Sequence, residues 1–345
     1  MQPPIAPRQQ NFFKRLFAKL LGQASAPVQA SGLFHMRTEL ALLQSSVAKL
    51  NSAYGRRDVA SVKALLASTN RRDFEAAVRD RVHTVPLPDA TVLCRVLGRY
   101  KLYVDANDRS MAPHLMMEGY WQYWITAFLC RNLNRGETAY DLEAGYGYYS
   151  LLMSELVGDD GRVVALEYNP WLFQLLRRNI ALNGRDGIVV IQRLVAASKA
   201  AAARELPAPL TGPATGINQA AQFRRSTTDT CVAPAMTLDG LEPGNTDLVR
   251  VSALGLELGA LEGMTGVMDR SPSLRIILDF VASRCANPEA TLKVLAQRFP
   301  LRFIDWDSQA KPITIEEVLE RGEATLFLSQ AEPRCTQAAW LGCHA

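Results

Sequence analysis

The 345-residue sequence predicts an α/β protein whose core is a doubly wound, mostly parallel sheet, with a helical extension at the N-terminus. An apolar strand at 138–142 leads into a glycine-containing turn and then a helix that begins near Tyr148. A second apolar strand at 162–166 follows one crossover later and ends in a carboxylate, Glu167. Strands and helices alternate as far as residue 330, which is the pattern of a sheet covered by helices on both faces.

The composition is typical of a globular protein that can bury a sizeable core, since hydrophobic residues make up 48% of the sequence. No apolar run is long enough to span a bilayer. Lys14, Arg15 and Lys19 interrupt the apolar residues near the N-terminus, so no secretory signal is predicted. The six cysteines form no Cys-x-x-Cys pair, which predicts reduced thiols, no metal site and a cytoplasmic location.

Positive charge is concentrated in the N-terminal part of the chain. Residues 1–90 hold 13 Lys and Arg against 6 Asp and Glu, although the net charge of the whole sequence is only +4. A basic arm of this kind favours an acidic partner or an anionic membrane surface. A solvated helical face explains the same charge distribution without any partner.

Residues 1–31 are expected to be a disordered arm that contains one short helix at 11–22. Asn11 suits the N-cap of this helix and Gly22 its C-terminal end, and three phenylalanines lie on one apolar stripe. A basic amphipathic helix predicts a peripheral place at the inner membrane face or a groove in a protein partner. The alternative is that the helix packs on its own chain.

Residues 32–88 are expected to form a helical region. Apolar residues between Met36 and Tyr54 recur at heptad spacing over about two and a half repeats, which predicts a short coiled coil. A homodimer through residues 36–54 and a helical hairpin within one chain both satisfy this pattern. Two further helices are expected near 58–68 and 72–82, before two prolines close the region.

Residues 89–335 are expected to form one α/β domain, followed by a tail at 336–345. The strands are expected at 101–105, 138–142, 162–166, 188–194, 247–251, 274–280, 301–304 and 324–329, and the helices at 119–132, from 148, at 170–182, 257–268 and 288–298. Four aromatic residues open the first of these helices, and a buried helix face is favoured for them over a stacking platform: Tyr120, Trp121, Tyr123 and Trp124.

The turn after residue 142 has the chemistry of a cofactor loop. Gly145 and Gly147 allow the backbone to approach a ligand, and the helix that follows offers free N–H groups to an anion. Glu167 ends the neighbouring strand, where its carboxylate can accept hydrogen bonds from ribose hydroxyls. Ser150 replaces the third glycine of a dinucleotide fingerprint, so S-adenosylmethionine is favoured over NAD. A purely structural tight turn is the alternative.

Several segments resemble, in order, motifs of the FkbM-type methyltransferase family over roughly residues 95–330. They are Tyr140-Asp-Leu-Glu-Ala-Gly-Tyr-Gly-Tyr-Tyr-Ser-Leu-Leu152, Gly161-Arg-Val-Val-Ala-Leu-Glu-Tyr-Asn-Pro170, Leu175-Leu-Arg-Arg-Asn-Ile-Ala-Leu-Asn-Gly184, Thr237-Leu-Asp-Gly-Leu241, Asp247-Leu-Val-Arg-Val-Ser-Ala-Leu-Gly-Leu-Glu257, Leu261-Glu-Gly-Met264 and Ile277-Leu-Asp-Phe280. The resemblance implies a seven-stranded, Rossmann-like methyltransferase sheet and S-adenosylmethionine as the cofactor.

The resemblance also implies roles for individual residues. Asp141, with the two loop glycines, would shape the methionine end of the site, Glu167 would hold the ribose, and Asn169 would help to close the edge. Glu143 stands where the family has glycine. Its negative charge beside the methionine carboxylate would lower cofactor affinity, unless the side chain pairs with the cofactor's ammonium group or turns away.

The chain departs from the family at the expected acceptor side. Ser252 and Leu254 replace two carboxylates at the end of the fourth strand. Glu257 and Asp279 are the remaining candidates for a catalytic base, although a helix dipole alone also favours Glu257. A solvated or structural role is favoured for His114.

Two functions follow from these observations. The first is an FkbM-type O-methyltransferase that acts on a hydroxyl of a sugar, glycan or small metabolite. The second is a catalytically degenerate methyltransferase fold that serves as an interaction or scaffold protein, tethered by residues 11–22. Neither reading indicates a nucleic-acid partner.

Overall fold

The computed structural model describes residues 59–196, 206–207, 230–231, 235–241, 244–252 and 257–333. The chain divides between Arg57 and Asp58, so residues 58–88 belong to the same compact unit as the sheet. This differs from the division expected at residue 88. The predicted arm, the helix at 11–22, the heptad segment at 36–54 and the tail at 336–345 lie outside the described residues and stay predictions.

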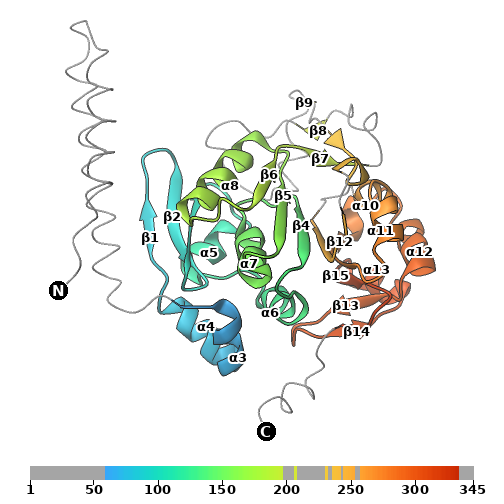
Figure 1. Ribbon diagram of the computed structural model, residues 1–345, viewed down its shortest axis with the longest axis horizontal. Helices are drawn as coiled ribbons and strands as arrows, with labels where there is room; N and C mark the ends of the chain where they lie inside the picture. Colours follow the sequence, from blue (N-terminus) through green and yellow to red (C-terminus); the bar gives the residue numbers. More distant parts are fainter. Residues whose placement is uncertain are drawn as a thin grey trace, which may run out of the picture. The chain divides into compact units, whose positions relative to one another are not determined.

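An eight-stranded sheet lies at the centre of the described part of the chain (Figure 1). Its spatial order is β14 (Ala310–Pro312), β13 (Arg302–Ile304), β15 (Glu323–Leu328), β12 (Arg275–Val281), β11 (Leu248–Val251), β4 (Thr138–Leu142), β5 (Arg162–Leu166) and β6 (Val189–Ile191). Strands β12, β11, β4, β5 and β6 are parallel, whereas β15 is antiparallel to β12 and β13. The predicted doubly wound, mostly parallel class is confirmed. The sheet has one strand more than predicted, because β14 pairs with β13 at its edge.

The strand order reverses direction between β4 and β11. From β4 the chain proceeds outward through β5 and β6, then returns to place β11 and β12 on the other side of β4. Open α/β sheets bind ligands beyond the carboxyl ends of the strands at such a switch point. The loop after β4 lies at this place, so the topology and the sequence motif indicate the same site.

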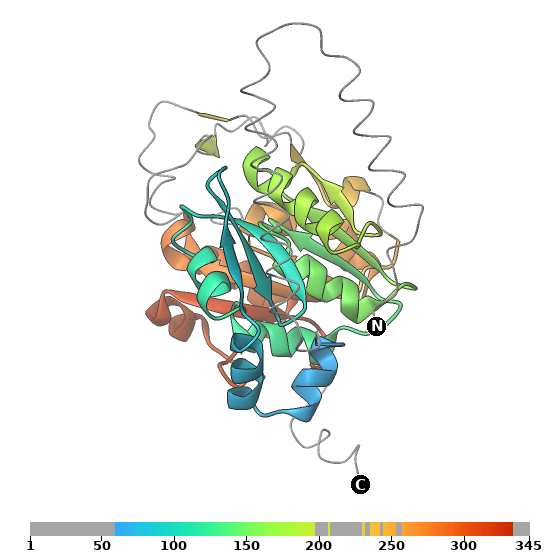
Figure 2. The same cartoon turned by 90° about the vertical axis from the view of Figure 1, so that its left-hand side faces the viewer.

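A three-stranded antiparallel sheet precedes the main sheet and packs against α8 and α5 (Figure 2). It contains β1 (Thr84–Pro86), β2 (Thr91–Val96) and β3 (Tyr100–Asp105), of which the sequence predicted only the third. The helices of this part are α3 (Val62–Ser68), α4 (Arg71–Arg79), α5 (Ala112–Met117) and α6 (Tyr123–Asn132). Helices α3 and α4 lie within or close to the two predicted helical ranges.

The helices that cover the main sheet are α7 (Tyr148–Val157), α8 (Pro170–Leu182), α10 (Glu257–Glu262), α11 (Thr265–Arg270), α12 (Pro288–Arg298) and α13 (Ile315–Arg321). Short pairs join β7 (Leu194–Val195) to β10 (Ala235–Met236) and β8 (Leu206–Pro207) to β9 (Thr230–Cys231), and the 3-10 helices are η2 (Asp239–Leu241) and η3 (Ala282–Arg284). The helix expected at 257–268 is therefore two helices. Within the described ranges, no helix is long and apolar enough to cross a membrane.

The two faces of the main sheet contribute to two separate cores. Alternate side chains of each strand point to opposite faces. Ala139, Leu248 and Ile277 join the core formed with α3 to α8, whereas Tyr140 and Val249 join the core formed with α10 to α13. Apolar contact on both faces explains why these strands are almost wholly apolar.

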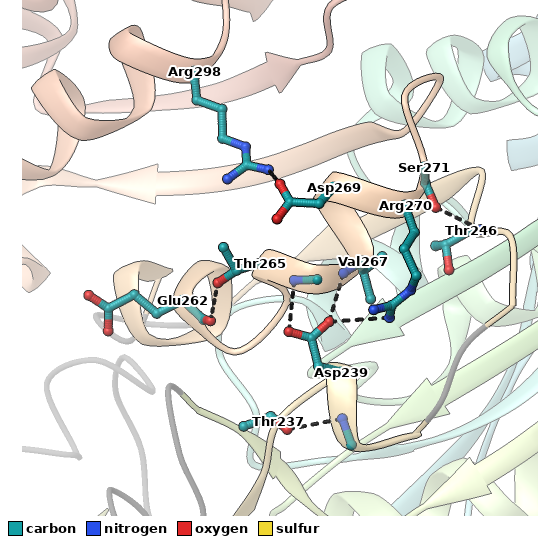
Figure 3. Close-up of polar contacts among 12 residues, drawn as sticks. Thr237, Asp239, Thr246, Glu262, Thr265, Val267, Asp269, Arg270, Ser271 and Arg298 are labelled. Atoms are coloured by element: carbon teal, nitrogen blue, oxygen red, sulfur yellow. Dashed lines mark hydrogen bonds and ion pairs between the residues drawn. The ribbon is translucent and has the colours of Figure 1, made fainter.

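Asp239 shows that one of the family-like motifs is structural (Figure 3). Its carboxylate accepts hydrogen bonds from the N–H groups of Gly266 and Val267 at 2.9 and 2.7 Å, and so holds the start of α11. Arg270 approaches the same carboxylate at 3.6 Å. A Cβ on Gly266 would lie 2.9 Å from Oδ1 of Asp239, so this capping arrangement requires glycine there.

The substitution Asp239→Ala is expected to lower the free energy of unfolding by about 1–2 kcal/mol, because two N–H groups lose their acceptor. Chemical denaturation measures this change. Asp269→Ala is the control, since it removes only an exposed ion pair with Arg298 (Figure 3) and should cost less than about 1 kcal/mol. Equal losses from the two substitutions would contradict the capping role.

Candidate cofactor site

The loop between β4 and α7 is held by its own backbone. The N–H of Ala144 donates to the carbonyl of Leu166 on β5 at 2.9 Å, and the N–H of Gly147 donates to the carbonyl of Ala144 at 2.9 Å. These bonds connect the ends of β4 and β5, where the motif predicts the cofactor. The predicted strand and helix boundaries around the loop are confirmed.

The two loop glycines are required for different reasons. Both have positive φ, +56° at Gly145 and +85° at Gly147, which glycine adopts without strain. A Cβ on Gly147 would lie 2.6 Å from Cδ1 of Leu176 on α8, so this glycine permits close helix packing. A Cβ on Gly145 would meet no atom within 4 Å, so the loop backbone faces open space there. A ligand can therefore approach at Gly145.

Glu143 occupies a backbone conformation that suits glycine. Its φ is +58°, in the left-handed region that disfavours residues with a Cβ. The FkbM-type motif has glycine at this position, and the backbone conformation gives the physical reason. The loop thus keeps the shape of a glycine-rich turn although it carries a half-buried glutamate.

The substitution Glu143→Gly is expected to raise the free energy of unfolding by about 0.5–1 kcal/mol, because it removes the left-handed strain at some cost in unfolded-state entropy. Urea denaturation measures the change. Glu323→Gly, at an exposed strand position, is the control and should be destabilising. Loss of stability in Glu143→Gly would show that contacts of the glutamate outweigh the strain.

Glu167 is almost fully buried directly after β5. Its Oε2 accepts from the N–H of Gly145 at 2.9 Å, and its Oε1 accepts from the N–H of Asn169 at 2.8 Å. Each carboxylate oxygen has a further lone pair, so hydroxyl donors can also bind. The structure thus places Glu167 against the cofactor loop, as the spacing of the two strands predicted.

Burial raises the pKa of Glu167 to about 7, although the N–H groups of Asn169 and Gly145 oppose this shift. A protonated carboxyl would present an O–H in a place already occupied by two N–H donors. Ligand hydroxyls that donate to Glu167 therefore favour its ionised form.

Asparagine side chains fix the surroundings of the loop. Asn169 caps α8, since its Oδ1 accepts from the N–H groups of Trp171 and Leu172. Asn179 donates to the carbonyls of Tyr146 and Tyr103, and thereby joins α8 to the loop and to β3. Asn179 is therefore structural, whereas the cofactor-site role of Asn169 stays a prediction beside its capping of α8.

Three charged residues lie side by side on one face of β4, β11 and β12. Arg250 donates to Oδ1 of Asp141 at 3.3 Å and to Oδ2 of Asp279 at 2.8 Å. Thr325 on β15 donates to the other oxygen of Asp279 at 2.9 Å, and Ser150 on α7 donates to Asp141 at 2.6 Å. The network joins β4, β11, β12 and β15, and Ser150 connects it to α7, the helix that follows the cofactor loop.

Burial determines the electrostatics of this network. Burial raises the pKa of Asp141, and the neighbouring Arg250 only partly offsets this. Burial alone would lower the pKa of Arg250, but Asp279 and Asp141 outweigh it, so the pKa is raised and the guanidinium stays charged. The guanidinium also lies 4.2 Å from the ring centroid of Tyr149. Asp141 therefore links β4 to α7 through Ser150 and to β11 through Arg250.

Sequence reasoning missed Arg250. The signal was a single charged residue inside the apolar run Leu248-Val-Arg-Val251, which predicts a buried partner of opposite charge. The partners lie on strands more than 25 residues away in sequence, so the pairing depended on the strand order.

The predicted catalytic residues are not brought together by the described contacts. Asp279 is partly exposed, but both of its oxygens are engaged by Arg250 and Thr325. Glu257 begins α10, as expected, but its side chain and all of Leu254 lie outside the described residues. His114 lies on α5 against Trp121, with ring centroids 4.9 Å apart.

The aromatic residues before and within α6 differ in burial. Tyr123 is buried against Phe74, whereas Tyr120, Trp121 and Trp124 are half-buried against the same core. The described residues contain no cluster of three His, Cys, Asp or Glu side chains suited to a metal ion.

Comparisons with known proteins agree with the class of this fold. The model of the TRM5/TYW2 methyltransferase domain matches residues 126–202, which contain β4, the loop, α7, β5 and α8. Protein-L-isoaspartate O-methyltransferase 1 of Archaeoglobus fulgidus is 32% identical over 82 residues, covering 23% of this chain and 33% of that protein. The chain thus spans about one third of the length of this curated relative.

The solved structures that resemble this chain match it with low TM-scores. Trm5b from Pyrococcus abyssi has 15% identity and a TM-score of 0.37, covering 70% of this chain and 55% of its own. Methyltransferase FkbM from Methylobacillus flagellatus KT has 14% identity and a TM-score of 0.36, with coverages of 56% and 43%. The tRNA m1G37 methyltransferase of M. jannaschii has 14% identity and a TM-score of 0.33, with coverages of 70% and 56%. The fold class follows from the strand order of the sheet.

The chain has the class I S-adenosylmethionine-dependent methyltransferase fold, and the matched domain and relatives support S-adenosylmethionine as its cofactor. Membership of the FkbM family stays a prediction. The expectation that no nucleic acid is a partner stays a prediction.

Proposed function

We propose that this protein is an S-adenosylmethionine-dependent methyltransferase that methylates an oxygen atom, a hydroxyl of a sugar or small metabolite. The observation that carries the proposal is the pairing of Glu167 with the open loop at Gly145. The carboxylate suits the ribose hydroxyls, and the loop leaves room for the methionine end of the cofactor. When bound, the cofactor supplies a sulfonium methyl group.

The acceptor side supplies fewer groups than the cofactor side. In the transfer, the acceptor oxygen bonds to the methyl carbon while the carbon–sulfur bond breaks, and the hydroxyl proton must pass to a base. Asp279 on β12 is the described candidate for this base, although Arg250 and Thr325 contact its two oxygens, and Glu257 begins α10. An acceptor that is already a carboxylate would need no base, and the relative from Archaeoglobus fulgidus is named as an O-methyltransferase of isoaspartate.

Transfer of a radiolabelled methyl group tests this proposal. Purified protein, labelled S-adenosylmethionine and separate pools of sugars, small metabolites, peptides and tRNA are incubated, and the products are treated with alkali. Alkali-stable label in the sugar or metabolite pool is expected, because a methyl ether resists base. Label released as methanol would indicate a carboxylate acceptor, and label in tRNA would place the acceptor in nucleic acid; either result contradicts a hydroxyl metabolite.

A second candidate, a degenerate fold that acts as a scaffold, is favoured by the combination of Glu143 in the loop and Ser252 at the end of β11. It predicts that deletion of residues 1–31 abolishes partner or membrane binding. It also predicts that Glu167→Ala leaves the cellular phenotype unchanged. Complete loss of cellular function from Glu167→Ala alone would contradict the scaffold function.

A further inference from the structure

The loop between β3 and α5, residues 106–111, reaches the cofactor loop from the three-stranded sheet. Asp105 ends β3, and its Oδ1 accepts from the N–H of Asn107 at 2.8 Å. Asp108 lies within the loop, and its Oδ1 accepts from the N–H of Ser110 at 2.7 Å. One oxygen of each aspartate thus holds the shape of this loop, and the second oxygen of each contacts residues outside it.

The second oxygen of Asp108 binds the residue at the centre of the cofactor loop. The hydroxyl of Tyr146 donates to Oδ2 of Asp108 at 3.0 Å and accepts from the N–H of Asp105 at 3.3 Å. Tyr146 is almost fully buried and lies between Gly145 and Gly147. Because its two neighbours have no side chain, the ring of Tyr146 ties this stretch of the cofactor loop to the β3–α5 loop.

The direction of this hydrogen bond is fixed by burial. Burial raises the pKa of Tyr146 well above 10, and the negative charge of Asp108 raises it further. The hydroxyl therefore stays a donor and the carboxylate its acceptor. A buried hydroxyl that donates to a charged group forms one of the stronger hydrogen bonds in a protein, and its loss leaves a buried polar group unpaired.

The second oxygen of Asp105 fastens the β3–α5 loop to α8. The indole N–H of Trp171 donates to Oδ2 of Asp105 at 3.0 Å. Trp171 lies in the first turn of α8, and its backbone N–H donates to Asn169, whose own N–H donates to Glu167 at 2.8 Å. The β3–α5 loop is thus held against the segment that carries Glu167, and Asp108 is a fixed anchor for Tyr146.

We propose that Asp108 and Tyr146 are positioning residues, which hold the backbone at Gly145 in the shape that receives the methionine end of S-adenosylmethionine. The proposal rests on the proposed function. Both residues act through the backbone of the cofactor loop, which faces open space at Gly145. A site that takes its binding shape only part of the time binds its ligand more weakly in proportion. The three-stranded sheet therefore contributes to cofactor affinity through its loop.

The test compares S-adenosylmethionine with 5′-methylthioadenosine by calorimetry of the full chain at pH 8. The second ligand keeps the nucleoside and the sulfur but lacks the amino and carboxylate groups. Tyr146→Phe keeps the buried ring and removes the hydroxyl. We expect it to bind S-adenosylmethionine about tenfold more weakly, because the loop loses a hydrogen bond to a charged acceptor. Binding of 5′-methylthioadenosine should weaken less than about twofold, because Glu167 still accepts from the ribose.

Tyr100→Phe is the matched control for a purely structural role. Tyr100 is also a buried tyrosine of this region, on β3, and its hydroxyl also donates to a carboxylate, that of Glu155. Both variants should lower the urea concentration at the midpoint of unfolding, because each loses such a bond. Tyr100→Phe should leave both affinities unchanged. If Tyr146→Phe gives the same result as Tyr100→Phe, the proposal is overturned.

Asp108→Asn completes a double-mutant cycle and keeps the test valid if Tyr146→Phe does not fold. It should also bind S-adenosylmethionine about tenfold more weakly, and adding Tyr146→Phe should weaken binding no further, because the two residues act through one bond. Additive losses, or equal weakening of both ligands, overturn the proposal while the proposed function stands. A folded wild-type chain that binds neither ligand overturns the proposed function and this proposal with it.

Discussion

Arg250→Met is expected to lower the free energy of unfolding by about 3–5 kcal/mol, because it leaves two carboxylates without their buried cation. Asp141 is fully buried, and Asp279 is about four-fifths buried as a side chain. Urea denaturation at pH 8 measures the loss. The loss should shrink as the pH falls, since protonation removes the uncompensated charge of the buried aspartates.

Two controls separate this effect from general damage to the chain. Arg72→Met removes an exposed arginine and should change stability by less than about 0.5 kcal/mol. Adding Asp141→Asn and Asp279→Asn to Arg250→Met should restore part of the lost stability, because no buried charge is then left unpaired. A loss below about 1 kcal/mol in the single variant would mean that the network does not stabilise the sheet.

Glu167→Ala is expected to weaken binding of S-adenosylmethionine about 100-fold, because two hydroxyl groups lose a charged acceptor worth about 1.5–3 kcal/mol each before partial compensation by water. Calorimetry at pH 8 measures this change. Glu155→Ala is the matched control: this half-buried glutamate accepts from Val62 and Tyr100 at a distance from the loop, so its loss should affect stability but not affinity.

The pH dependence of stability and of cofactor affinity tests the role of Glu167 independently. The pKa of Glu167 is raised from 4.5 to about 7 in the folded protein. Its contribution to stability is therefore fully present below pH 4.5 and is lost as the pH rises through 7, on the order of 3 kcal/mol in total. Cofactor affinity should move oppositely and rise about tenfold from pH 6 to pH 8, since binding favours the ionised carboxylate. A cofactor affinity independent of pH in this range would contradict the assigned role.

The sequence was most informative where a pattern is local. Strands β4 and β5 and helices α8 and α12 have the predicted boundaries, because each combines an apolar repeat with a clear cap or turn. Helix α13 was not predicted, although Thr314 and Glu317 form a capping box that marks its start.

The remaining features depend on partners distant in the sequence. Strand β2 is buried along its whole length and contains Arg95, so no alternation of apolar and polar residues marks it. Within the site, the glycines and Glu167 were recognisable from spacing. The role of Arg250 depends on the strand order, which no local pattern encodes.

Calorimetric titration of the purified full-length chain with S-adenosylmethionine at pH 8 tests the central claim most directly. The account predicts a single binding site of micromolar affinity, weakened about 100-fold when Glu167 is replaced by alanine. A chain that unfolds cooperatively, and is therefore folded, but gives no binding heat and no thermal stabilisation by the cofactor would contradict it.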